Sequence, residues 1–149
     1  MATAHDVEIA DRLSRRRARI FPVLGFFFLV GQARFFAGDQ PLSRAVDQFK
    51  ISAWLVWAVA LLLALAFAGG HFRGARVRAL MEDETTRANR QSAYALGFWA
   101  AMLASVAAYV LNMFEQVGGL DAIHLVLTAG VGAAILRFGL LERRSFRNA

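Results

Sequence analysis

Four long apolar segments dominate the sequence, and short polar connections separate them. Each segment has about the length, roughly 20 residues, that an α-helix needs to cross a ~30 Å hydrocarbon layer. Apolar residues make up 58% of the chain, above the ~45–50% usual in soluble domains. The 149 residues are too few to hide four such helices from water. We therefore expect an all-α polytopic membrane protein, a four-transmembrane-helix bundle, with spans at 20–38, 51–70, 92–114 and 120–141.

Basic residues gather in three polar segments. Residues 1–19 carry five arginines, the connection 71–91 carries five and the tail 142–149 carries three, whereas the other two connections hold only Arg44 and Lys50. Positive residues are retained on the cytoplasmic side of membrane helices. Both termini and the connection 71–91 are therefore expected in the cytoplasm. An even number of spans independently places both termini on one side, so the transmembrane domain 20–141 is expected to form two antiparallel hairpins.

The basic residues have two other interpretations. A formal net charge of +6 is also typical of nucleic-acid-binding proteins, but these arginines flank apolar segments, where topology and anionic lipid headgroups account for them. We therefore expect the lipid bilayer as a partner and no direct contact with nucleic acid. The arginines of 15–19, followed by an apolar run and small residues, also fit a signal peptide whose removal would leave three spans.

Small residues recur at four-residue spacing in the last three expected spans. Such stripes let helix backbones approach closely inside a membrane. They serve either packing within the bundle or contact with a second copy of the chain, which would make a homo-oligomer. The stripes are Ala60, Ala64 and Ala68; Ala100, Ala104 and Ala108; and Ala129 and Ala133.

A group of polar residues is expected at the outer mouth of the bundle. Arg34 follows Ile20 by 14 residues, roughly 21 Å along a helix, which places it in the outer part of the bilayer. One interpretation is a site for a polar or anionic ligand, as in a small transport or ligand-binding protein. The other is that Arg34 extends to the lipid headgroups and its neighbours cap helices. The candidate residues are Gln32, Arg34, Asn112, Glu115, Asp121 and His124.

Other polar residues in the spans are interpreted structurally. Trp54 and Trp57 begin the second span, where indole rings favour the membrane interface. Ser105 and Thr128 are expected to hydrogen-bond to carbonyl groups of their own helices.

The sequence lacks the combinations of residues that common catalytic and cofactor sites need. The chain has no cysteine, and the three histidines, His5, His71 and His124, are expected at different depths, so no two of them can hold a haem or a metal ion together. There is no phosphate-binding loop and no nucleophile paired with a base. No carboxylate lies in the middle of a span, as proton-coupled export would require. We expect a non-enzymatic protein without cofactor or metal.

The connection 71–91 contains an acidic run inside an otherwise basic segment. One interpretation is a docking face for a cytoplasmic partner. The other is a solvated helix leading into the third span, since carboxylates followed one turn later by arginines favour a helix. The candidate docking residues are Glu82, Asp83, Glu84, Arg87 and Arg90.

The same segment carries a resemblance. The sequence Asp83-Glu84-Thr85-Thr86, followed by Arg87 and Arg90 and leading into Gly97-Phe98-Trp99, resembles an uncharacterised group of small bacterial membrane proteins. These proteins have four spans and an Asp-Glu-x-Thr signature before the third span, and they are often encoded beside helix-turn-helix regulators. The resemblance covers about a third of the chain. It implies a place in the bacterial inner membrane, no known enzyme activity, and a role in restraining or signalling to a cytoplasmic transcription regulator.

Overall fold

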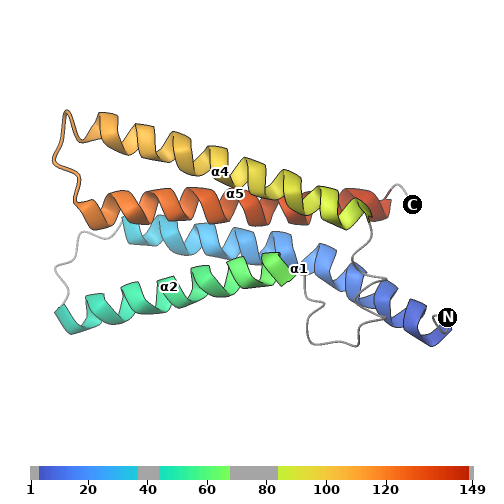
Figure 1. Cartoon of the computed structure of the whole chain (residues 1–149). Helices are drawn as coiled ribbons and strands as arrows, with labels where there is room; N and C mark the ends of the chain where they lie inside the picture. Colours follow the sequence, from blue (N-terminus) through green and yellow to red (C-terminus); the bar gives the residue numbers. More distant parts are fainter. Residues whose placement is uncertain (1–3, 37–43, 68–83, 148–149) are drawn as a thin grey trace.

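The computed structural model describes residues 4–36, 44–67 and 84–147, and these form four α-helices and the short connection 112–118. The all-α architecture expected from the sequence is confirmed. Figure 1 shows the helices alternating in direction along a bundle, with the start of the first helix and the end of the last at the same end. The helices are α1 (Ala4–Phe36), α2 (Arg44–Phe67), α4 (Glu84–Leu111) and α5 (Gly119–Arg147).

All four helices extend beyond the expected apolar segments, α2 and α4 at their starts, α5 mainly at its end and α1 by the most. The basic segment 1–19 is helical from Ala4 onward and continues without interruption into the expected span 20–38. Exposed ion pairs of Arg12 with Glu8 and of Arg15 with Asp11 join successive turns there, and such pairs stabilise a helix in polar surroundings. α5 likewise continues to Arg147, through most of the expected tail.

α5 is the helix against which the other three pack. It makes extended contacts with α4 and α1 and a smaller contact with α2. α4 and α5 are adjacent and antiparallel, as the short connection between them predicts (Figure 1). α1 and α2 also run in opposite directions, but the extended contact of α1 is with α5. The bundle is thus organised around α5 more than around two equal hairpins.

Small residues explain how α4 comes so close to α5. A Cβ atom built on Gly97 would lie 2.9 Å from the Ala134 Cβ atom and 2.9 Å from the Gly130 carbonyl oxygen. A Cβ atom on Gly130 would in turn lie 3.1 Å from the Ala101 Cβ atom. Small residues of α4 and α5 therefore serve packing within the bundle at this crossing.

Glycines of α5 also receive bulky groups from α1. A Cβ atom on Gly139 would lie 2.6 Å from Pro22 Cδ, and one on Gly132 would lie 2.6 Å from Leu29 Cδ2. Next to the Pro22–Gly139 contact, the Phe21 and Phe138 rings meet edge to face, with centroids 5.1 Å apart. The side chains of Phe28, Leu65, Ile135 and Phe138 are the largest that are fully buried. The main core therefore lies along the inward face of α5.

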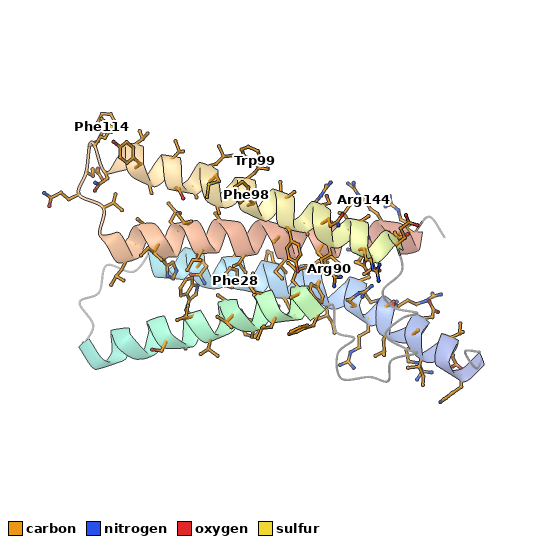
Figure 2. The ribbon with its side chains drawn as sticks, in the orientation of Figure 1. Phe28, Arg90, Phe98, Trp99, Phe114 and Arg144 are labelled. Carbon is orange, nitrogen blue, oxygen red and sulfur yellow. The ribbon has the colours of Figure 1, made fainter. Side chains whose placement is uncertain are left out.

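Large apolar side chains cover the outside of the bundle. On α4, Leu103 is 68% exposed and Tyr109 is 72% exposed. Figure 2 shows Phe98, Trp99 and Phe114 on the side of the bundle away from α1 and α2. Two helical segments, Glu84–Leu111 and Gly119–Ser145, are long and apolar enough to cross a membrane, and α2 contains a shorter apolar stretch, Ser52–Phe67.

Candidate functional site

Two polar clusters interrupt the apolar interior. The first, the outer cluster, consists of Gln32, Trp54, His124 and Thr128. Gln32 of α1 and His124 of α5 are both buried, and Gln32 Oε1 contacts His124 Nε2 within hydrogen-bonding distance. The structure therefore brings together two of the residues that the sequence placed at the outer mouth of the bundle.

Trp54 joins this cluster from α2. Its ring stacks on the His124 imidazole, with centroids 4.0 Å apart and an interplanar angle of 27°. The position of Trp54 at the start of an apolar segment had indicated an interface residue like Trp57, not a partner of His124. The sequence did contain a signal for this contact: the spacing of Trp54 puts it on the same helical face as Ala58, Leu61 and Leu65, which are buried.

Two buried polar atoms of the outer cluster have no hydrogen-bond partner among the residues that the structure describes. They are Trp54 Nε1 and Thr128 Oγ1. Thr128 is 7% exposed and lies one turn after His124 on the same face of α5. Leaving such an atom unpaired costs about 1–3 kcal/mol. The expected bond from Thr128 to its own helix is not made, whereas Ser105 Oγ does donate to the Ala101 carbonyl oxygen at 2.8 Å.

The remaining outer candidates lie around the connection between α4 and α5. Asn112 Oδ1 accepts a hydrogen bond from the Val117 backbone N–H at 3.1 Å and so shapes this connection. Glu115 is exposed within the connection, and Asp121 is exposed in the first turn of α5. Arg34 lies in α1, but its side chain is outside the described part of the structure.

The second cluster, the inner network, lies at the end of the bundle where α1 begins and α5 ends. Its centre is an ion pair between Arg17 of α1 and Glu142 of α5, whose side chains are 5% and 3% exposed. Arg17 Nε donates to Glu142 Oε2 at 3.0 Å, and Arg17 Nη2 donates to Thr86 Oγ1 of α4 at 3.1 Å. The guanidinium carbon also lies 5.6 Å from the centroid of the Phe138 ring.

Further hydrogen bonds complete the network around the carboxylate. Asn89 Nδ2 donates to Glu142 Oε1 at 3.2 Å, so both carboxylate oxygens have partners. Buried charges are tolerated when they are paired and hydrogen-bonded in this way. The inner network thus ties α1, α4 and α5 together. This network was not predicted from the sequence, because Arg17 is one of several arginines in the basic segment 1–19 and Glu142 stands at the start of the polar tail.

The candidate docking residues are spread over different environments. Glu84 begins α4 and is exposed, and Arg87 is exposed one turn later. Arg90 Nη1 donates to the Ala66 carbonyl oxygen in the last turn of α2 at 3.0 Å, and Figure 2 shows Arg90 at this end of the bundle. Glu82 and Asp83 lie outside the described residues.

Within the described ranges, no three His, Asp or Glu side chains are placed to hold a metal ion together. Comparisons with family models, with curated proteins and with solved structures found no match. The two polar clusters and the surface around them are therefore the features of the molecule that bear on its function.

Proposed function

We propose that this chain is a non-enzymatic integral membrane protein whose four helices all cross the bacterial inner membrane. The apolar outer surface supports this proposal, since Leu103 and Tyr109 on α4 and Phe26 and Phe27 on α1 are exposed. Large apolar side chains exposed on several helices in this way are typical of contact with lipid. Both termini and the connection 71–91 would lie on the cytoplasmic side, where their arginines satisfy the positive-inside rule.

Single-cysteine labelling tests this topology, because the natural chain has no cysteine. Glu115→Cys in the α4–α5 connection should react with a membrane-impermeant maleimide on intact spheroplasts. Thr85→Cys at the start of α4 and Arg144→Cys near the end of α5 should react only after the membrane is permeabilised. Labelling of Thr85→Cys on intact spheroplasts, or release of the chain by alkaline carbonate, would contradict the proposal.

For the role of the protein, we propose interaction with a cytoplasmic regulatory protein through the inner end of the bundle. The observation that supports this role is the inner network, because it holds the first turns of α4 against α1 and α5 through Thr86 and Asn89. Glu84 and Arg87 are presented on the outside of those same turns. A partner bound there would act on all three helices together. The resemblance of residues 83–90 to the group of small bacterial membrane proteins implies that this partner is a transcription regulator.

Photocrosslinking tests the interaction. A photoreactive amino acid at Thr85 or Ala88, both exposed on the first turns of α4, should form an adduct with one cytoplasmic protein in intact cells. The same amino acid at Leu103 serves as the control, because that side chain is exposed on the apolar surface. Changing Glu82, Asp83 and Glu84 to lysine should remove the adduct, whereas Glu115→Lys and Asp121→Lys should not. An adduct that survives the triple reversal would rule out this docking face.

The outer cluster supports a second candidate function, binding or transport of a small polar ligand. The observation in its favour is the pair of buried, unpartnered atoms, Trp54 Nε1 and Thr128 Oγ1, beside the Gln32–His124 contact. A ligand with hydrogen-bonding groups would satisfy both atoms. Purified protein screened against polar and anionic metabolites should then show a rise in melting temperature that Gln32→Leu and Arg34→Leu remove. A screen without any stabilising compound would count against this function.

A further inference from the structure

We propose that the outer ends of α4 and α5 hold one acyl chain of a membrane phospholipid in a groove between the two helices. This inference rests on the membrane location proposed above and adds a specific lipid site to it. Three features support the proposal: the shape of the groove, the chemistry of its walls and the polar groups at one of its ends.

The groove exists because α4 and α5 diverge. The two helices are in close contact at the Gly97–Gly130 crossing and separate toward their connection (Figure 1). The resulting space has a volume of about 510 Å³, within the range of small-molecule sites. It extends from Ser105 in α4 to Asn112, the residue after the last of α4, a distance of roughly 10 Å at 1.5 Å per residue. An elongated space of this length suits part of an alkyl chain.

The walls of the groove are apolar. Ala108 and Ala122 are small and leave room between the helices, and Ile123, Val126 and Leu127 provide alkyl surface from α5. The hydroxyl group of Ser105 also lines the groove but already donates to the Ala101 carbonyl oxygen. The deep part of the groove therefore offers no unsatisfied polar group for a polar ligand.

Polar groups lie at the end of the groove near the connection. Asn112 uses its Oδ1 atom to accept from the Val117 N–H, and its side-chain NH₂ group is a further hydrogen-bond donor at this end. Tyr109 lines the same end and is highly exposed. Tyrosine is enriched at the level of the lipid headgroups. An amphiphile with an ester or phosphate at Asn112 and an alkyl chain toward Ser105 matches this gradient.

A phospholipid fits better than a second copy of the chain. The groove lies between two helices at the level of small side chains, while exposed Tyr109 and Ile123 at its edges would keep another helix at a distance. A single alkyl chain is thin enough to enter between them. The lipid would fill space that the divergence of α4 and α5 leaves open.

Photocrosslinking with lipid tests the site. The protein is reconstituted in vesicles of phosphatidylglycerol and phosphatidylethanolamine containing a phospholipid with a diazirine in its acyl chain, and crosslinked residues are mapped by mass spectrometry. We expect stronger labelling of Val126 and Ala122 in the groove than of fully exposed Leu103. Ala122→Phe should lower labelling of Val126 roughly tenfold, which corresponds to ~1.4 kcal/mol of binding. Leu103→Phe, the matched control outside the groove, should leave it unchanged.

The outcomes distinguish the proposed lipid site from the proposed membrane location. Labelling of Leu103 and Val106 without enrichment at Val126, or labelling of Val126 that Ala122→Phe leaves unchanged, would overturn the lipid site and leave the membrane location intact. Absence of labelling on the whole outer face of α4 would overturn both. The enrichment at Val126 in the natural chain is informative even if Ala122→Phe fails to fold, and the melting temperature of each variant shows whether it folds.

Discussion

Arg17 and Glu142, 125 residues apart in the chain, form a buried ion pair that joins α1 to α5. Both partners have further hydrogen bonds, Arg17 to Thr86 and Glu142 to Asn89. The pair is therefore the centre of a network rather than an isolated contact. Variants that lack either side chain should show how strongly the stability of the bundle depends on this ion pair.

Removing one partner should destabilise the protein strongly. Arg17→Leu and Glu142→Leu should each lower the free energy of unfolding by about 3–5 kcal/mol, because each leaves an uncompensated buried charge. The double variant should lose less than the sum of the two. The measurement is unfolding in detergent micelles, and Asp11→Ala is the control, since it breaks the exposed Asp11–Arg15 pair and should cost at most about 1 kcal/mol. Additive losses would mean that the two side chains stabilise the fold independently.

Two glycines, Gly97 of α4 and Gly31 of α1, should respond differently to substitution by alanine. Gly97→Ala should cost roughly 1–3 kcal/mol, because the added methyl group meets Ala134 and the Gly130 carbonyl oxygen. Gly31→Ala should be neutral or stabilising by up to about 1 kcal/mol, since a Cβ atom there has no neighbour within 4 Å among the described residues and alanine favours a helix. Melting temperatures of the two variants provide the comparison. Equal effects would contradict the close α4–α5 crossing.

Two buried threonines offer a matched test of the polar clusters. Thr86→Val removes the hydroxyl that accepts from Arg17 and should cost about 1–3 kcal/mol. Thr128→Val removes a hydroxyl without a partner in the described structure, so the stability of the ligand-free protein should stay the same or rise. If the outer cluster binds a polar ligand, Thr128→Val should also remove the ligand-dependent rise in melting temperature. A large loss of stability from Thr128→Val alone would show that its hydroxyl has a structural partner.

The helices could be predicted from the sequence because their apolar segments have a characteristic length. The expected span 120–141, for example, lies wholly within α5. The helix ends were harder to predict, since α1 and α4 begin in charged segments where pairs such as Arg15–Asp11 stabilise additional turns. Apolar periodicity gives no information on where such a segment stops being helical.

The polar clusters could be predicted only in part. Gln32 and His124 were expected at similar depth, and depth follows from position along a helix. Which helices face one another does not follow from depth. The partnership of Trp54 with His124, and that of Arg17 with Glu142, depends on the rotation of each helix about its axis and on the central place of α5.

The central position of α5 in the bundle affects when the protein can fold during its synthesis. Because α5 follows α1, α2 and α4 in the chain, a ribosome makes the three outer helices before the helix against which they pack. Until α5 emerges, Arg17 lacks its carboxylate partner, and Gly97 lacks the small residues that it contacts. The native bundle can therefore assemble only late in translation or after it, once α5 has been made.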